Sequence, residues 1–338
     1  MYMRHLGLSL AASIFVVFMV VWGGRFFSPR APAVTPPGDV RPPAVDGKRP
    51  VMVTNGLKHN VPLDEIKSGG PARDGIPSID RPKFVTIAQA NTYVGDEEPG
   101  LAVSIGDEDR FYPYQILVWH EIVNDTINGN RVLVTYCPLC LSGIVFDPVV
   151  NGERVEFGTS GKLWNSNLVM YDRTTESLWS QVLAVAIAGE MTGTKLPILP
   201  SDVVKYGQWK TLHPDGEVLS RDTGMARRYG DDPYGNYYST PDVWFPVKNR
   251  DDRLAPKEFI LGISTNGSAK AYWPDAVKRV GMVEDQFAGK TIVARYEHDI
   301  GAVRLYEKTA DGQLERINPI ASYWFAWAAA HPLTEVYR

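Results

Sequence analysis

The sequence predicts a mostly β protein with few short helices, and three features of the residue pattern support this fold class. Short runs rich in β-branched and aromatic residues recur along the chain, for example at 101–105 and 131–136. The dipeptide Asn151-Gly152 separates two further runs and favours the type I′ turn of a β-hairpin. The same kinds of segment return about 160 residues later.

This repetition indicates an internal duplication. Self-similarity at one fixed spacing is the signature of repeated structural units. The matching positions are Tyr112 with Tyr272, 123–130 with 283–290, Val132 with Ile292, Tyr136 with Tyr296, and Asn151-Gly152 with Asp311-Gly312. We therefore expect two related β-rich units, about residues 80–172 and 240–328, packed as one body and joined by an insert at 173–239.

Helix is expected at few places, and the best candidate lies near the C-terminus. Asn318-Pro319 precedes an alanine-rich stretch that ends at Ala330. Asparagine is a favoured N-cap residue and proline is favoured at the first helical position. The sequence therefore predicts a helix that begins at Asn318-Pro319.

The N-terminal 28 residues read as a membrane segment. Residues 6–24 carry no charged side chain and include the apolar run 14–22. This length approaches that of a membrane-crossing helix, whereas the apolar region of a secretory signal is usually shorter. We expect 1–28 to be a signal anchor, with a cleaved signal peptide as the alternative. The body is then exported to the periplasmic or extracytoplasmic side of the cell envelope, anchored to the inner (cytoplasmic) membrane or secreted after cleavage.

A proline-rich linker follows at 29–50, with seven prolines and few large apolar side chains. Such a segment favours extended polyproline conformations and suits a spacer between a membrane and the folded body at 51–338. A disordered tail is the alternative. The whole chain has a net charge of −4 with both signs interspersed, which argues against nucleic acid as a partner. The expected partners are the membrane and an envelope protein that the sequence does not identify.

Cys137 and Cys140 are the only cysteines among the 338 residues, and they form a Cys-x-x-Cys motif at the end of the expected strand 131–136. Two thiols at this spacing can bind a metal ion, cycle between dithiol and disulfide, or do neither. In an oxidising compartment, close thiols tend to form a disulfide unless a metal or a reducing partner prevents it. The second unit carries Glu297 and Ile300 at the equivalent positions. We therefore expect the first unit to carry the specialised chemistry.

Two histidines are candidate partners of the thiols. His120 lies on the segment that leads into the cysteine strand, and His213 lies in the insert. Thiolate and imidazole ligands suit zinc or copper. The predicted metal or redox set is Cys137, Cys140 and His120, with His213 as a possible additional ligand. The residues expected to orient this set are Tyr136, Glu121, Asn124 and Asp125.

These residues leave three classes of function open. The first is a thiolate metal site, most plausibly for copper, and the second is a thiol/disulfide redox site. The third is a non-catalytic ligand-binding or scaffolding module with a structural disulfide. The sequence does not say whether the protein is an enzyme.

Three motifs carry a resemblance to a known family. They are Val-Thr-Tyr-Cys-Pro-Leu-Cys at 134–140, Trp-His-Glu-Ile-Val-Asn-Asp at 119–125 and Asn-Leu-Val-Met-Tyr-Asp at 167–172. Together with Ser-Leu-Trp-Ser-Gln at 177–181, they resemble the bacterial and archaeal domain-of-unknown-function family numbered three-one-seven-nine, over roughly residues 77–334. The resemblance implies an exported protein but no activity. Leu141 departs from the family pattern, which implies a small residue, usually glycine, after the second cysteine.

Overall fold

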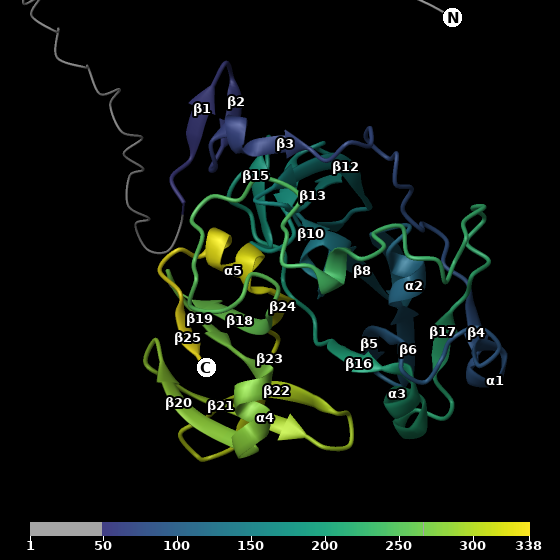
Figure 1. Ribbon diagram of the computed structural model, residues 1–338. Coiled ribbons are helices and arrows are strands. Elements are labelled where there is room, and N and C mark those ends of the chain that lie inside the picture. Colours follow the sequence, from purple (N-terminus) through teal and green to yellow (C-terminus); the bar gives the residue numbers. More distant parts are fainter. Residues whose placement is uncertain (1–48, 266) are drawn as a thin grey trace, which may run out of the picture. The chain divides into compact units, whose positions relative to one another are not determined.

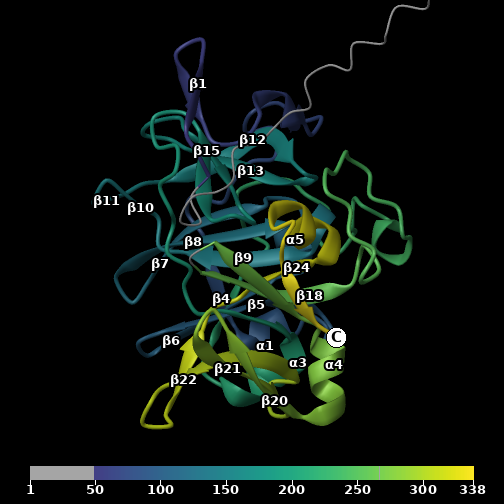
Figure 2. The same ribbon diagram turned by 90° about the vertical axis from the view of Figure 1, so that its left-hand side faces the viewer.

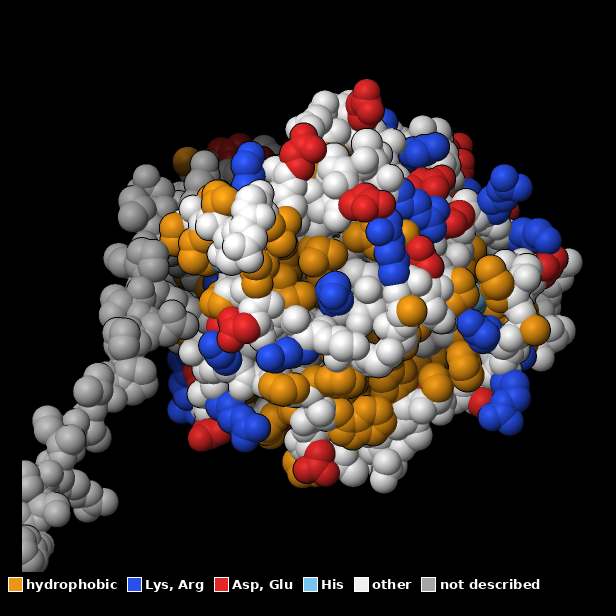
Figure 3. Space-filling view, turned by 90° about the horizontal axis from the view of Figure 1, so that it is seen from above, with side chains coloured by type: hydrophobic (Ala, Val, Ile, Leu, Met, Phe, Trp, Pro, Cys, Tyr) orange, Lys and Arg blue, Asp and Glu red, His pale blue; other side chains and the backbone are white. Residues whose placement is uncertain are grey.

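The structure is a computed structural model that describes residues 49–265 and 267–338, all within one compact unit (Figure 1). The predicted signal anchor and nearly all of the predicted linker lie outside these residues. Among the helices of the described residues, none has the length and apolar character needed to cross a bilayer. Figure 3 shows basic and acidic side chains interspersed with apolar ones on one face, without one sign dominating.

The described chain is mostly β with few short helices, as predicted. The largest sheet has the strand order β1 (Met52–Thr54), β2 (Leu57–His59), β15 (Val185–Ala188), β14 (Leu178–Ser180), β13 (Asn167–Asp172), β12 (Phe157–Trp164) and β3 (Ile66–Ser68). The hairpin of β10 (Val149–Val150) and β11 (Glu153–Arg154) turns at Asn151 and Gly152, whose φ angles of 53° and 84°-side turn partners need positive values; Gly152 itself has φ 82°. This confirms the predicted hairpin.

Two further sheets lie between 84 and 219. One contains β16 (Asp202–Lys205), β5 (Pro99–Ile105), β6 (Glu108–Pro113), β17 (Glu217–Leu219) and β4 (Phe84–Thr86). The other contains β7 (Ile122–Ile127), β8 (Asn130–Cys137) and β9 (Ser142–Phe146). The helices of this region are α1 (Ile87–Ala90), α2 (Tyr114–Leu117) and α3 (Tyr206–Leu212), with the 3₁₀ turns η1 (Leu63–Glu65), η2 (Pro138–Cys140) and η3 (Tyr237–Ser239) before and after it.

The C-terminal region has two four-stranded sheets. The first contains β24 (Ile320–Tyr323), β18 (Phe259–Thr265), β19 (Ser268–Tyr272) and β25 (Glu335–Tyr337). The second contains β20 (Met282–Phe287), β21 (Lys290–Glu297), β22 (Ala302–Lys308) and β23 (Leu314–Ile317). The helices are α4 (Pro274–Val280) and α5 (Trp324–Ala330).

The order of elements is the same in both regions. β5, β7 and β8 begin at Pro99, Ile122 and Asn130, whereas β18, β20 and β21 begin at 259, 282 and 290, so each pair of starts differs by 160. In one sheet β16 pairs antiparallel with β5 and β17 pairs parallel with β6. In the other, β24 pairs antiparallel with β18 and β25 pairs parallel with β19. The strands β16 and β17 come from the region predicted as the insert.

The C-terminal helix begins later than predicted. Residues Ile320–Tyr323 form β24, which pairs with β18, and the helix α5 starts only at Trp324. The side chain of Asn318 does not cap a helix, because its Nδ2 donates to Ile198 O at 3.1 Å. The prediction was wrong here because pairing with a strand distant in sequence overrode the local helix signal.

The cysteine turn lies in the largest hydrophobic core. Figure 2 shows β8 and β9 between β12 and β13 on one side and β18 and β24 on the other. This core includes both cysteines and the buried indoles Trp164, Trp179 and Trp324. Aromatic side chains bury large areas, so the turn is surrounded by closely packed apolar groups.

Candidate functional site

The cysteine turn joins two paired strands. β8 ends at Cys137, the turn η2 follows, and Cys137 pairs with Ser142 at the start of β9. Leu141 closes the turn in the left-handed conformation, with φ 47° and ψ 33°. That conformation costs an L-residue about 1–2 kcal/mol relative to glycine. The family resemblance implied glycine at this position, and the backbone angles give the physical reason.

The two sulfur atoms lie in contact with each other. Both cysteines are free, and the Sγ atoms of Cys137 and Cys140 are 3.4 Å apart. The residues are only 2% and 0% exposed. Cys140 Sγ donates to Ser166 O at 3.2 Å and accepts from Asn167 Nδ2 at 3.5 Å. Burial raises the pKa of the Cys140 thiol well above its usual value, so this thiol keeps its proton at neutral pH.

A buried glutamine supports the turn from below. Gln181 is fully buried, and its Nε2 donates to Thr135 Oγ1 at 2.9 Å and to Ser142 O at 3.0 Å. Its Oε1 accepts from Ser142 Oγ at 2.7 Å and from Asn167 Nδ2 at 3.0 Å. Asn167 is held further by Val182 N, which donates to its Oδ1 at 3.0 Å. The network fixes the amide that contacts the Cys140 sulfur.

Sequence reasoning did not assign Gln181 or Asn167 to the site. Both lie within motifs that carry the family resemblance, at 177–181 and 167–172. A polar side chain inside a run expected to be buried is the available signal, since buried polar groups require hydrogen-bond partners.

A segment at 229–245, called here the aromatic cover, lies over the turn. Tyr237 OH donates to Leu139 O at 2.8 Å, between the two cysteines in sequence. The ammonium of Lys257 lies 3.3 Å from the centre of the Tyr237 ring, and the Trp244 ring packs edge-on to it at 4.6 Å. These contacts seal the sulfurs from solvent.

Glu121 is a buried carboxyl group next to the turn. Its backbone is left-handed, with φ 58°, and its carbonyl accepts from Tyr136 N at 2.8 Å, one residue before Cys137. Its side chain is hydrogen-bonded to Tyr234 of the aromatic cover. Burial raises the pKa of Glu121 to about 8, so the carboxyl is mostly protonated at neutral pH.

Glu121 is expected to make the stability of the protein depend on pH. The folded-state pKa of about 8 exceeds the ordinary value of 4.5, so unfolding releases a proton between these two pH values. The free energy of unfolding should therefore be highest below pH 4.5 and fall by roughly 4–5 kcal/mol as the pH rises to about 8. Glu121→Gln should remove this component. Urea unfolding at about pH 5 and about pH 8 measures it, and equal pH slopes in both proteins would contradict the assignment.

His120 is fully buried and engaged on both sides of its ring. Its Nδ1 donates to Pro77 O at 2.7 Å, and its Nε2 accepts from Tyr229 OH at 2.6 Å. Burial lowers the pKa of His120, which favours the neutral ring that these two bonds require. The ring therefore ties one end of the aromatic cover to the strand side. To bind a metal beside the cysteines, His120 would have to give up at least one of these bonds.

The structure places His213 against other residues. It follows α3, with Nδ1 2.9 Å from Asp109 Oδ2 and its ring stacked on Trp209 at 5.6 Å. Within the described part of the chain, no three or more His, Cys, Asp and Glu side chains form a group that could hold a metal ion.

The remaining predicted residues hold neighbouring strands. Tyr136 packs its ring 4.2 Å from that of Tyr114. Asn124 Nδ2 donates to Phe157 O at 2.9 Å, and its Oδ1 accepts from Phe157 N at 2.9 Å, which joins β7 to β12. Asp125 accepts from Arg110 Nη1 at 2.8 Å and from Tyr112 OH at 2.5 Å, which joins β7 to β6. The predicted role of Asn124 and Asp125 in orienting the cysteines is therefore not visible in these contacts.

Comparisons with known proteins add a family assignment. Neither a search of curated proteins nor a search of solved structures gave a significant match. A family model described as "Protein of unknown function (DUF3179)" matches residues 73–334, which include the cysteine turn, Gln181 and the aromatic cover. The chain therefore belongs to the DUF3179 family, as the resemblance in its sequence predicted.

Proposed function

We propose that Cys137 and Cys140 form a redox site that cycles between dithiol and disulfide. The observation that carries this proposal is the 3.4 Å contact between the two free sulfurs on a turn supported by Asn167 and Gln181. A disulfide requires a separation of about 2.05 Å, which modest side-chain rotation can supply. The expected exchange partner is a disulfide of another envelope protein or of a small thiol compound.

The exchange balances without a further reactant. The thiolate of one cysteine attacks a partner disulfide and forms a mixed disulfide, which releases one partner thiol. The thiolate of the other cysteine then displaces the second partner thiol. The pair loses two protons and two electrons in total, and the partner disulfide gains them.

The aromatic cover must open before a partner reaches the sulfurs. From 220 to 258 the described chain forms no regular element except the short turn η3. Segments with few regular backbone hydrogen bonds open at lower free-energy cost than core strands. The cover therefore provides a route to sulfurs that are buried in the closed form.

The test is oxidation of the purified full-length protein. After reduction, incubation with oxidised glutathione should produce an intramolecular disulfide, seen by mass spectrometry as the loss of two hydrogen atoms and reversed by dithiothreitol. Cys137→Ser and Cys140→Ser should accumulate a mixed disulfide with glutathione instead, because no second thiol resolves it.

Metal binding at the same pair is the competing prediction, and elemental analysis separates the two. Copper or zinc retained in stoichiometric amount, and lost in Cys137→Ser, would contradict the redox proposal and favour a site that includes His120. A protein that neither forms a reversible disulfide nor holds metal would contradict both. A ligand-binding or scaffolding module would then remain.

Tyr237→Phe is expected to increase the reactivity of the thiols. The substitution removes the hydrogen bond from Tyr237 OH to Leu139 O, which contributes about 1 kcal/mol to keeping the cover closed. The rate of alkylation by iodoacetamide under native conditions should rise about fivefold. Tyr306→Phe removes a hydroxyl bonded to Glu297 in the second unit and is the matched control. Equal rates in both variants and in the unsubstituted protein would show that the cover does not control access.

We also propose that residues 1–28 anchor the body on the extracytoplasmic side of the cytoplasmic membrane. The uncharged segment 6–24 supports this. Protease added to spheroplasts should cleave the body, and N-terminal sequencing distinguishes an anchor from a cleaved signal peptide. Protection of the body in intact spheroplasts would contradict export.

The matching order of elements supports a further proposal, that the body arose by internal duplication. β5, β7 and β8 have counterparts at a constant spacing of 160 residues, and each unit has one parallel strand pair at the same place in its sheet. An experimental structure in which β5–β9 and β18–β22 do not superpose would contradict this proposal.

A further inference from the structure

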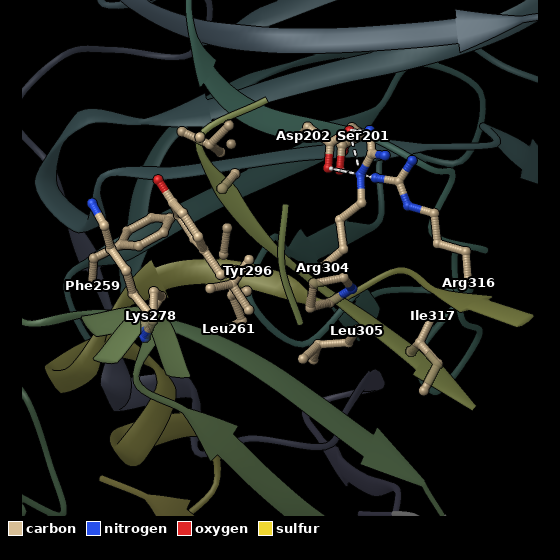
Figure 4. A pocket seen from close by; sticks show the side chains of 18 of the residues that line it. Ser201, Asp202, Phe259, Leu261, Lys278, Tyr296, Arg304, Leu305, Arg316 and Ile317 are labelled. Carbon is tan, nitrogen blue, oxygen red and sulfur yellow. Dashed lines mark hydrogen bonds and ion pairs between the residues drawn. The ribbon is translucent and has the colours of Figure 1, made fainter. Parts of the chain in front are cut away.

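The second unit contains a pocket that is separate from the cysteine turn. It has a volume of about 220 Å³ and lies among α4, β18, β22, β23 and β24, with β16 closing one side. Figure 4 shows Arg304 and Arg316 reaching toward Asp202 on one side of the pocket, and Lys278 beside Tyr296 on the other. The lining thus brings charged groups from distant parts of the chain to one cavity.

The charged groups of the pocket have a positive balance. Arg304 and Arg316 both bind the single carboxylate of Asp202, Arg304 through Nε at 3.2 Å and Arg316 through Nη2 at 2.6 Å. Lys278 adds a third cation, with its ammonium 5.0 Å from the centre of the Tyr296 ring, and Asp275 is the other acidic residue of the lining. Three cations face two carboxylates, which leaves one positive charge.

Arg316 has hydrogen-bonding capacity left for a ligand. Its Nη2 is used by Asp202 Oδ1 and by Ser201 O at 3.0 Å. A guanidinium carries five N–H donors in a planar fork, so the remaining donors at Nε and Nη1 can bind an oxyanion. The opposite character appears at Leu261, Leu305 and Ile317, which give the same cavity an apolar wall.

The first unit shows that these cations are not required to build such a unit. The positions 160 residues before Lys278, Arg304 and Arg316 are occupied by Val118, Ile144 and Glu156. Val118 and Ile144 are buried apolar residues. The second unit thus carries cations where the first has two apolar residues and one acid. Charges that a related unit does without point to a ligand rather than to folding.

We propose that this pocket binds a small organic anion, namely a carboxylate with a short aromatic or branched apolar body. The carboxylate lies between Lys278 and the free donors of Arg316, and the apolar body packs on Leu261 and Leu305. Asp202 keeps the two guanidinium groups in place and lowers the net charge to that which a monoanion matches. The site does not involve the cysteines, so it stands independently of the redox proposal.

Isothermal titration calorimetry of the full-length protein with benzoate tests the site. Saturable one-to-one binding is expected, with benzyl alcohol, the neutral analogue, at least tenfold weaker because it lacks the charge. Inorganic phosphate should also bind at least tenfold more weakly, since it gains nothing from the apolar wall. Absence of saturable benzoate binding, or equal affinity for benzyl alcohol or phosphate, would overturn the proposal.

Variants assign the binding to the named residues. Lys278→Met keeps the apolar stem but removes the charge, and it should weaken benzoate binding at least tenfold, whereas Lys278→Arg should restore most of the affinity. Lys308→Met is the matched control, because Lys308 pairs with Glu284 at 2.9 Å and does not line the pocket. Circular dichroism identifies any variant that does not fold. A folded Lys278→Met protein with unchanged affinity, or an equal loss in Lys308→Met, would overturn the assignment.

Discussion

Replacing Gln181 with leucine should lower the free energy of unfolding by about 3–5 kcal/mol, although the two side chains are similar in size. The substitution leaves the Ser142 hydroxyl and one Asn167 N–H without the acceptor that they share, Oε1 of Gln181, in a fully buried place. It also removes the donor to Thr135 Oγ1 and Ser142 O. Each buried group that loses its partner costs about 1–3 kcal/mol.

Urea denaturation measures the effect, with Gln286→Leu as the matched control. Gln286 is exposed and donates to Thr291 Oγ1 at 2.8 Å, so its loss should change the free energy of unfolding by less than about 0.5 kcal/mol. Because Gln181 also holds Asn167 against the Cys140 sulfur, Gln181→Leu should in addition increase the alkylation rate of the thiols. Equal stability losses in the two variants would show that the buried network contributes nothing specific.

Asp125→Ala is expected to cost about 3–5 kcal/mol, because it leaves the largely buried guanidinium of Arg110 without its closest carboxylate. Tyr112 OH loses its acceptor at the same time. The Asp125 side chain is only 4% exposed, so water cannot replace these bonds. Thermal or urea unfolding gives the magnitude.

Asp285→Ala tests the same arrangement in the second unit and should cost less. Asp285 binds Lys270 at 2.5 Å and Tyr272 OH at 3.2 Å, but its side chain is 22% exposed. Lys270 also keeps a second carboxylate, Glu335, at 3.2 Å. We expect a loss of about 1–2 kcal/mol, since water and Glu335 compensate in part. A larger loss for Asp285→Ala than for Asp125→Ala would contradict the dependence on burial.

These two clusters explain why the repeat was visible in the sequence. The matched pairs Tyr112 with Tyr272 and Asp125 with Asp285 form the same contact in each unit, between the second strand of one sheet and the first strand of the next. Buried polar groups need partners, so such a pair is replaced less freely than the apolar residues around it.

Local signals were reliable where local chemistry decides the conformation. Asn151-Gly152 predicted its hairpin because both residues adopt positive φ readily. Asn318-Pro319 misled because the following residues pair with β18, about sixty positions earlier, and that pairing decides their conformation. No pattern near Asn318 carries information about a distant strand.

The site divides in the same way. The two cysteines were found from their spacing alone, and the left-handed Leu141 agrees with the glycine that the family resemblance implied. The bonds of His120 were not foreseeable, because Pro77 and Tyr229 lie 43 and 109 residues away in sequence. The pocket cations were missed for the same reason, since Asp202 lies 102 residues from Arg304.

The sequence by itself determined that the body is mostly β, that one hairpin turns at Asn151-Gly152, and that the only thiols form a close pair after a strand. These properties depend on backbone preferences and on spacings of a few residues. Only the tertiary structure decided that the thiols are buried beneath an aromatic segment, that Gln181 supports them, and that three cations line a pocket in the second unit. Those properties depend on side chains brought together by long-range strand pairing, because a hydrogen bond or an ion pair requires proximity in space and not in sequence.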